Sequence, residues 1–319
     1  MLFFMWKKLR KNVFIGFIIV SIYLLVPCMI TLAVTGVVGQ SESEELISGR
    51  RVIVKSGNVT KTYEVNKFIA MVLASRWDIS KEMEVLKAQS IMVRTDIYRM
   101  MGEEYSIDSD KLQMPYLTER QMKNKWGESF EINYNLIMDC VNSTTGTVIT
   151  YNGQLIEAKM QEVSGGKTLS GSMYLGENYA YLAEVECTQD IQSPNFLRVV
   201  TFSNKEFVKK IKNAYQDVVL DESNPLGAVQ IVSKSESGYV IKIQVGNVVL
   251  SGGTLANILG INSSCMMLEK SDEGVKITTK GVGDGFGVSL YYADYMAKNG
   301  NSYEEILARF YSKTTLAAW

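Results

Sequence analysis

The chemistry open to this chain is limited first by what it lacks, because none of its 319 residues is histidine. Mechanisms that need an imidazole base or a histidine metal ligand are therefore excluded. Cys140, Cys187 and Cys265 lie far apart, without the close C-x-x-C spacing of a zinc site. We therefore expect no metal and no cofactor. A single disulfide among these three cysteines stays open, as does the alternative that all three are small buried hydrophobic residues.

Two glycine-rich segments could bring the backbone close to a ligand. Ser164-Gly165-Gly166 follows a predicted strand that ends at Met160, so it is either a simple turn or a loop that faces a ligand. The segment 281–287 has glycine at every second position. It could bind an anion, but it lacks the strand–turn–helix setting of a dinucleotide fingerprint. We expect these glycines to permit close backbone approach at the edge of a cleft.

The elements that position these segments are a mixture of helices and strands. Apolar residues at spacings of three and four predict a helix over 81–101, with Ser80 as its N-cap. Asn152-Gly153 predicts a hairpin of strands 146–151 and 155–160. The other strands are predicted at 51–55, 60–65, 229–233 and 239–248 and near 266 and 275, and the other helices at 204–214, 255–259, 289–297 and 303–310. No repeat or clear linker divides the chain, which predicts one α+β domain over 51–319.

The first forty residues predict a membrane anchor. The run 13–38 has no charged side chain and follows a basic cluster of Lys7, Lys8, Arg10 and Lys11. A run of this length can cross the hydrocarbon core as a helix, and basic residues tend to stay in the cytoplasm. A cleaved signal peptide is the alternative, but its apolar region is usually shorter. We expect a cytoplasmic segment 1–12, one transmembrane helix 13–38, a linker 39–50 and an extracytoplasmic domain, in a single-pass protein of the cell membrane.

Charge excludes one class of partner. Four of the 33 Lys and Arg lie in that N-terminal cluster, which leaves 29 against 34 Asp and Glu in the predicted exterior part. No basic run remains in this part of the sequence, so we do not expect nucleic acid as a partner.

Three segments of the exterior part carry a resemblance to a known family. The first is MVLASRW at 71–77 with MEVLKAQSIMVRT at 83–95, the second is SGGKT at 164–168, and the third is GVGDGFGVSLYYA at 281–293. In this order they resemble the stage II sporulation protein D / LytB family. The resemblance implies binding to the glycan strands of peptidoglycan. Active members resemble lytic transglycosylases, which cleave between N-acetylmuramic acid and N-acetylglucosamine with one carboxylic acid.

The chain departs from the family pattern where the chemistry is concentrated. Arg76 takes the place of the family's glutamate, and a guanidinium cannot donate a proton at physiological pH. Asp284 and Gln161 take the places of two family histidines, and 108–113 lacks the ligands that bind metal in some members. Because losing a general acid costs about 10²–10⁴ in rate, the resemblance implies a catalytically impaired member, a pseudoenzyme.

The resemblance also implies a substrate-binding site. Its residues would be Arg76, Gln89, Arg94, Ser164, Gly165, Gly166, Gly283, Asp284, Gly285 and Ser289. For Gln89 and Arg94, a buried polar network along the cleft and a solvated helix face are equally good interpretations. We expect Arg76, Gln89, Ser164, Gly165 and Asp284 to converge on one groove. We further expect an ion pair between Arg76 and Asp284 across its floor.

Two functions remain. The first is a catalytically inactive wall-remodelling protein of spore formation, which binds glycan strands or partners such as wall hydrolases and engulfment proteins. The second is an active lytic transglycosylase that uses another carboxylate, namely Asp78, Glu162 or Asp284. Anhydro-muramyl ends on treated glycan strands would distinguish the second function from the first.

Overall fold

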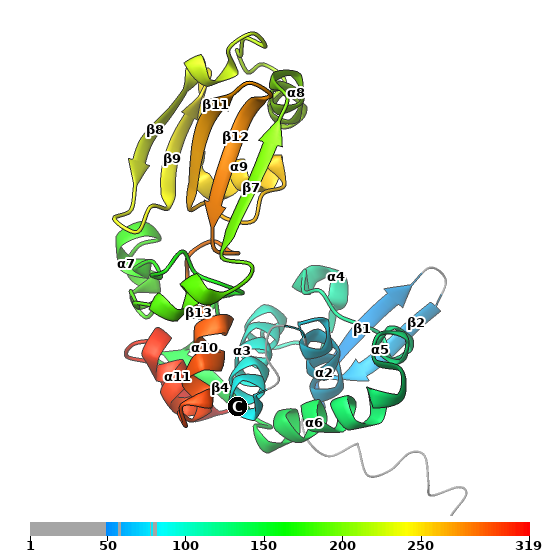
Figure 1. Cartoon of the computed structure of the whole chain (residues 1–319). Coiled ribbons are helices and arrows are strands. Elements are labelled where there is room, and N and C mark those ends of the chain that lie inside the picture. Colours follow the sequence, from blue (N-terminus) through cyan, green and yellow to red (C-terminus); the bar gives the residue numbers. More distant parts are fainter. Residues whose placement is uncertain (1–48, 57–58, 77, 79–81) are drawn as a thin grey trace, which may run out of the picture. The chain divides into compact units, whose positions relative to one another are not determined.

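The structure is a computed structural model, which describes residues 49–56, 59–76, 78 and 82–319 (Figure 1). The predicted segments 1–12 and 13–38, nearly all of the linker, and the predicted N-cap Ser80 lie outside these ranges. Within the ranges, no helix has the length and apolar character needed to cross a bilayer. Arg50–Trp319 forms one compact unit. Its mixture of helices and small sheets confirms the predicted α+β class.

A three-stranded sheet and a group of helices begin this unit. The sheet has the order β2-β1-β3, with β1 (Arg51–Ser56), β2 (Val59–Glu64) and β3 (Ser106–Asp108). The helices are α2 (Val65–Ser75), α3 (Met83–Met101), α4 (Ser109–Leu112), α5 (Glu119–Trp126) and α6 (Phe130–Ser143). Because α2, α3 and α6 pack against one another, they enclose the first hydrophobic core, which includes Phe68 and Ile137.

The helix α3 separates two hydrophobic cores because it carries apolar side chains on two faces. Leu86 and Val93 join the first core. Val85 and Met92 join a second core, to which the C-terminal helices α10 (Leu290–Lys298) and α11 (Tyr303–Phe310) contribute. Residues three and four apart share one face of a helix, and both stripes follow this spacing. The observed helix begins two residues later than predicted and ends at the predicted residue.

The predicted hairpin is present, but its second strand is shorter than expected. Its strands β4 (Thr147–Tyr151) and β5 (Gln154–Leu155) form a sheet with β14 (Thr315–Ala318). Asn152 and Gly153 have φ of 51° and 75°, as the tight turn of a two-residue hairpin requires. The predicted strand 155–160 does not continue, because β6 (Met160–Gln161) pairs in parallel with β13 (Val288–Ser289) instead. This pairing brings the second and third family-like segments together.

The segment 197–280 has a hydrophobic core of its own, which includes Phe207, Ile243 and Leu255. Its elements are β7 (Leu197–Phe202), α8 (Asn204–Ala214), β8 (Val229–Lys234), β9 (Val240–Val245), β10 (Val248–Ser251), α9 (Gly252–Leu259), β11 (Met266–Ser271) and β12 (Gly274–Lys280). The strands form two sheets, β10-β9-β8 and β11-β12-β7, with α8 and α9 packed against them (Figure 1). The predicted strand 239–248 is two strands, because the chain reverses at Gly246, where φ is 58°.

The remaining helices are short. They are α7 (Gly171–Tyr174), η1 (Gly127–Ser129), η2 (Glu177–Tyr179), η3 (Thr188–Gln192) and η4 (Pro225–Ala228). Cys140, Cys187 and Cys265 are buried and form no disulfide. Of the two alternatives that the sequence left open for these cysteines, the structure therefore supports small buried hydrophobic residues.

Candidate functional site

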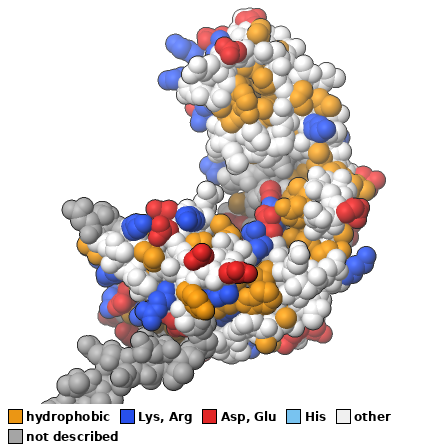
Figure 2. Space-filling model, turned by 180° about the vertical axis from the view of Figure 1, so that it is seen from behind, with side chains coloured by type: hydrophobic (Ala, Val, Ile, Leu, Met, Phe, Trp, Pro, Cys, Tyr) orange, Lys and Arg blue, Asp and Glu red, His pale blue; other side chains and the backbone are white. Residues whose placement is uncertain are grey.

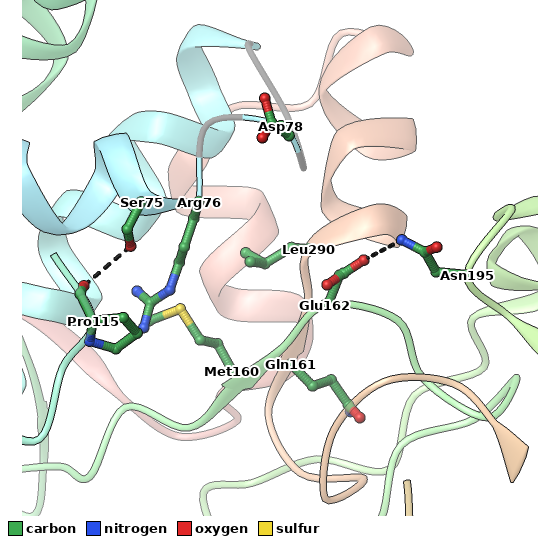
Figure 3. A pocket seen from close by; sticks show the side chains of 9 residues that line it. All are labelled: Ser75, Arg76, Asp78, Pro115, Met160, Gln161, Glu162, Asn195 and Leu290. Carbon is green, nitrogen blue, oxygen red and sulfur yellow. Dashed lines mark hydrogen bonds between the residues drawn. The ribbon is translucent and has the colours of Figure 1, made fainter. Parts of the chain in front are cut away.

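A pocket of about 500 Å³ is lined by residues of the first and third family-like segments and by residues just before the second (Figure 3). The first segment contributes Arg76, at the end of α2, and the third contributes Leu290, the first residue of α10. Gln161 and Glu162 come from β6 and the residue after it, just before the second segment. The remaining lining residues are Ser75, Asp78, Pro115, Met160 and Asn195.

Arg76 occupies one wall of this pocket. Its backbone N–H closes the last turn of α2 by donating to the Leu73 carbonyl at 2.9 Å. Its side chain extends from the end of the helix toward Met160 (Figure 3). Nη1 is fully buried and has no hydrogen-bond partner within the part of the chain that the structure describes. Burial lowers the pKa of the guanidinium, although the charge of Asp96 acts in the opposite direction.

The carboxylates of the pocket have partners other than Arg76. Glu162 Oε1 accepts a hydrogen bond of 2.6 Å from Asn195 Nδ2. Asp78 is mostly exposed at the pocket and forms an ion pair with Lys125 at 2.8 Å. In Figure 3, Arg76 and Glu162 extend from different walls. The pocket therefore presents a cation on one wall and a hydrogen-bonded carboxylate on another.

Gln161 holds the glycine-rich segment against β6. Its side chain is buried, and Oε1 accepts from the Gly285 N–H at 3.1 Å. A Cβ at Gly283 would lie 2.3 Å from the Gln161 Cβ, and φ at Gly283 is +142°. A Cβ at Gly287 would lie 1.8 Å from the Lys159 carbonyl oxygen. The expectation that these glycines permit close backbone approach is therefore confirmed.

A buried carboxylate behind the pocket ties the second and third segments together. Asp190 Oδ2 accepts from the Ser164 N–H at 2.8 Å and from the Ser289 hydroxyl at 2.7 Å. All three residues are completely buried. Burial raises the pKa of Asp190, while the hydrogen bonds from Ser164 and Ser289 act to lower it. Ser164 and Ser289 therefore position the chain around the pocket and do not line it. Their assignment to substrate binding stays a prediction.

The sequence interpretation did not single out Asp190. It lies outside the three family-like segments, so the resemblance gave no signal for it. A second tie comes from Gly165, whose N–H donates to the Tyr239 hydroxyl at 2.6 Å. A Cβ at Gly165 would lie only 3.0 Å from Cys265 Sγ. The Ser-Gly-Gly segment is thus packed against the 197–280 segment at this point.

Arg94 and Gln89 are buried on α3 and do not line the pocket. The Arg94 guanidinium donates to the carbonyl oxygens of Thr144 at 2.7 Å and Val141 at 3.1 Å, at the end of α6. It also donates to Asn66 Oδ1 at 3.2 Å. The interpretation as a buried polar network is therefore correct for Arg94, but that network joins α2, α3 and α6. Both amide atoms of Gln89 are without a partner among the described residues.

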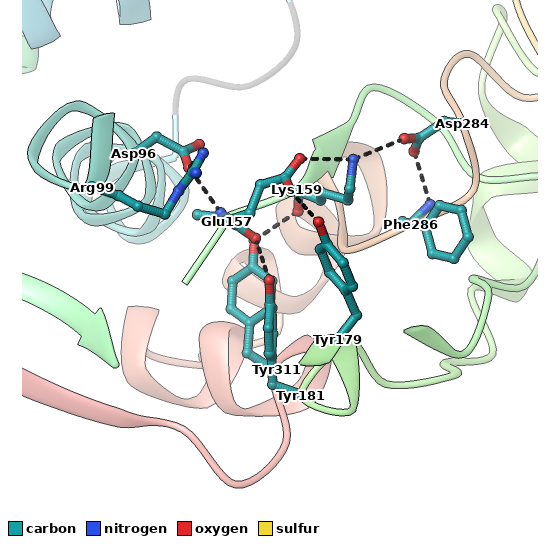
Figure 4. A network of polar contacts seen from close by, with 10 residues as sticks. Asp96, Arg99, Glu157, Lys159, Tyr179, Tyr181, Asp284, Phe286 and Tyr311 are labelled. Atoms are coloured by element: carbon teal, nitrogen blue, oxygen red, sulfur yellow. Dashed lines mark hydrogen bonds and ion pairs between the residues drawn. The ribbon is translucent and has the colours of Figure 1, made fainter. Parts of the chain in front are cut away.

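The predicted ion pair between Arg76 and Asp284 is wrong. Asp284 lies in a different pocket, of about 370 Å³, with Leu169 and Phe286. Its Oδ2 pairs with Lys159 Nζ at 3.5 Å, and its Oδ1 accepts from the Phe286 N–H at 3.0 Å (Figure 4). The five residues expected in one groove are therefore divided among this second pocket, the first pocket and the interior.

Charges of both signs are mixed around the site. Figure 2 shows basic and acidic side chains interspersed over the face that it presents. Lys159 illustrates the pattern, because it pairs with both Glu157 and Asp284. Burial acts to lower the pKa of Lys159, but the charges of Asp284 and Glu157 outweigh burial and raise it. Within the described ranges, no group of three or more Cys, Asp or Glu residues is placed to hold a metal ion. The absence of a metal site stays a prediction.

The chain belongs to the stage II sporulation protein D family, as a family model and its similarity to a relative of that name show. The family model described as "Stage II sporulation protein" matches residues 55–151. This range includes Arg76 and all of α3.

Two relatives match most of the chain. Stage II sporulation protein D of Bacillus subtilis (strain 168) is 30% identical over 261 residues, which cover 79% of this chain and 74% of the relative. The protein of the same name from Bacillus amyloliquefaciens is 29% identical over 264 residues, with coverages of 80% and 75%. A further relative, named "Amidase enhancer", from Bacillus subtilis (strain 168) is 26% identical over 298 residues, or 78% of this chain and 40% of the relative.

Proposed function

We propose that this protein is a membrane-anchored peptidoglycan-remodelling protein of sporulation, which binds glycan strands and is catalytically impaired. Family membership and the names of the two sporulation relatives support the cell-wall and sporulation part of this proposal. The uncharged run 13–38 behind a basic cluster supports the anchor, with the folded unit outside the cell. The observation that carries the impairment is Arg76, which lines the pocket that the first and third family-like segments help to form.

The chemistry of strand cleavage explains why Arg76 matters. A lytic transglycosylase needs one acid that protonates the leaving oxygen and then, as a base, helps a hydroxyl of the sugar close the anhydro ring. A carboxyl group of raised pKa can perform both steps. A guanidinium has no acceptor and keeps its proton, so it can perform neither. Binding does not require this acid, because Glu162 and Asn195 offer the pocket a hydrogen-bond acceptor and a donor.

Partner proteins form the second part of the proposal. One relative carries the name "Amidase enhancer", which favours a partner that is itself a wall hydrolase. In this arrangement the protein holds a glycan strand, and a hydrolase or another protein of the engulfment machinery acts beside it. A binding protein with an impaired site fits this role without cleavage of its own.

An active lytic transglycosylase remains the second candidate, and the geometry favours Glu162 as its acid. Glu162 lines the Arg76 pocket and accepts from Asn195, without a cation partner among the described residues. Asp78 is neutralised by Lys125 at 2.8 Å, and Asp284 lies in another pocket. Of the three carboxylates, only Glu162 combines a place in this pocket with freedom from an ion pair in the described part of the chain.

The two candidates are separated by one experiment on the full chain in detergent. Purified glycan strands are incubated with the protein, bound strands are measured by co-sedimentation, and anhydro-muramyl ends are measured by mass spectrometry. We expect binding without new ends. New ends that disappear in Glu162→Gln, but persist in the exposed control Asp78→Asn, would establish the second candidate. Absence of strand binding would contradict the proposed function itself.

A further inference from the structure

Among the residues that the structure describes, the guanidinium of Arg76 is a cation without a partner. Among the described residues it makes no hydrogen bond and no ion pair, and its Nη1 is fully buried. A buried polar group without a partner loses the free energy of its hydration and gains nothing in return, and this cost is larger for a charge. The side chain nevertheless lines an open pocket of about 500 Å³. An anion that entered this pocket would supply the missing interaction.

The neighbouring carboxylates do not supply it, because each has another partner. Asp78 pairs with Lys125 at 2.8 Å, and Glu162 accepts from Asn195 at 2.6 Å. Asp96 is mostly buried on α3, where its Oδ1 accepts from the Ala158 N–H at 3.1 Å and pairs with Arg99 at 3.3 Å. Its charge favours the protonated form of Arg76, but burial outweighs it and lowers the pKa. The loss of hydration at Arg76 is therefore not compensated within the described part of the chain.

We propose that the Arg76 pocket binds a carboxylate group, with the guanidinium as its anchor. The planar N–H fork of arginine matches the two oxygens of a carboxylate and forms charge-assisted hydrogen bonds with them. A dianion such as phosphate fits less well, because Glu162 and Asp78 line the same pocket and repel a second negative charge. At the position of the family's general acid, this chain would thus have a residue, Arg76, that binds a carboxylate.

This inference rests on the proposed function, since peptidoglycan is then the source of the carboxylate. Two groups share this chemistry. One is the lactyl carboxylate of an N-acetylmuramic acid residue that carries no peptide, and the other is the C-terminal carboxylate of a peptide stem. In either case the sugar or peptide beside the carboxylate would meet the polar side chains of Asn195 and Glu162. A matched set of small ligands distinguishes the two.

The experiment measures binding of these ligands to the full chain in detergent by isothermal titration calorimetry. N-acetylmuramic acid and N-acetylglucosamine share one sugar ring and differ by the lactyl group with its carboxylate. N-acetyl-D-alanyl-D-alanine presents a peptide carboxylate, and inorganic phosphate tests the dianion. We expect one of the two carboxylate ligands to bind at least about tenfold more tightly than N-acetylglucosamine, as charge-assisted hydrogen bonds would give.

Variants assign the effect to Arg76. Arg76→Gln should abolish the preference for a carboxylate, and Arg76→Lys, which keeps the charge and loses the fork, should weaken it severalfold. Arg120→Gln, which changes an exposed arginine outside this pocket, should preserve it. Thermal unfolding shows whether Arg76→Gln is folded. We expect its Tm to equal or exceed that of the parent, because a desolvated charge has been removed.

The outcomes separate this inference from the proposed function. Equal affinity for the two sugars together with no binding of the dipeptide, tighter binding of phosphate, or a preference that survives in Arg76→Gln would each overturn the carboxylate site. If full-length glycan strands still co-sedimented with the protein in that case, the proposed function would stand without the carboxylate site. If strands did not bind and the small carboxylate ligands did, the site would stand and the proposed function would fail.

Discussion

The Ser289 hydroxyl donates to Asp190 Oδ2 at 2.7 Å, across 99 residues of sequence. The same oxygen accepts the Ser164 N–H at 2.8 Å. One buried carboxylate therefore fixes the Ser-Gly-Gly segment and the start of α10 relative to each other. Ser289 is the last residue of β13, which pairs with β6, and both residues of β6 line the pocket of Arg76. The geometry of the pocket depends on this contact, although Asp190 does not line it.

The first prediction concerns the removal of that acceptor. Asp190→Ala leaves a buried N–H and a buried hydroxyl without a partner, so we expect a loss of about 2–4 kcal/mol in the free energy of unfolding. Asp190→Asn should cost less, because an amide oxygen in the place of Oδ2 can still accept both hydrogen bonds. Denaturant unfolding of the three proteins measures both effects. Equal stability of the parent and Asp190→Ala would show that the contact does not contribute.

The pH dependence of the stability of the parent and of Asp190→Asn tests the protonation of Asp190. Burial raises the pKa of Asp190 above its ordinary 3.8 in the folded state. The folded protein then binds the proton more tightly than the unfolded chain does, and this stabilisation is complete below pH 3.8. It is lost as pH rises through the folded pKa. The stability of the parent relative to Asp190→Asn should therefore fall as the pH rises above 3.8, and a rise would contradict the assigned direction.

The second prediction uses two glycines with opposite expected effects. Gly287 has φ of +73°, and a Cβ there would lie 1.8 Å from the Lys159 carbonyl oxygen. We expect Gly287→Ala to cost about 3 kcal/mol or more, or to prevent folding. Gly253, in α9, has only Ser251 Oγ near its Cβ position, at 3.8 Å. Gly253→Ala should therefore be neutral or stabilise the protein by up to about 1 kcal/mol. Thermal unfolding of both variants checks this difference in sign.

Local pattern predicted some helices well, because their signal lies within one segment, but it did not predict α2, α5 and α6. The predicted helices 204–214 and 303–310 coincide with α8 and α11. Strands were predicted less well, because their ends depend on partners far along the chain. After Leu155 the chain no longer pairs with β4, and β6 pairs with β13, 128 residues further along the chain. No spacing within 155–160 contains that information.

The residues of the site likewise divide into those that the sequence indicated and those that depend on contacts between distant segments. The sequence interpretation singled out Arg76, Glu162 and Asp78, and all three line the first pocket. It did not indicate where Asp284 points, because positive φ at Gly283 and Gly285 reverses the chain on both sides of it. It also did not indicate Asp190, whose importance comes from two partners in distant segments. Side-chain direction and buried pairing are tertiary properties.

The third prediction concerns Arg94, which is completely buried. Its guanidinium satisfies the carbonyl oxygens of Val141 and Thr144 at the end of α6, where the helix dipole also favours a cation. Arg94→Met should lower the free energy of unfolding by about 3 kcal/mol or more, because several buried acceptors lose their donor. Arg94→Lys should also be destabilising, since one ammonium cannot reproduce the fork. The exposed control Arg120→Met should change stability by no more than about 0.5 kcal/mol in the same urea titration.

The last prediction tests the position of Asp284 through the energetic coupling between charges. Lys159 Nζ lies 3.5 Å from Asp284 Oδ2, and the Asp284 side chain is 49% exposed. A double-mutant cycle of Lys159→Met and Asp284→Ala should therefore give a small coupling energy, above zero and below about 1 kcal/mol.

The matched cycle replaces Lys159→Met with Arg76→Gln. Because Arg76 and Asp284 belong to different pockets and form no ion pair, their coupling should be indistinguishable from zero. Charges in separate solvated pockets are screened, so their effects on unfolding add. A coupling between Arg76 and Asp284 that exceeded the coupling between Lys159 and Asp284 would contradict this placement. It would also supply Arg76 with an internal anion, and the case for a carboxylate ligand at Arg76 would lose its physical basis.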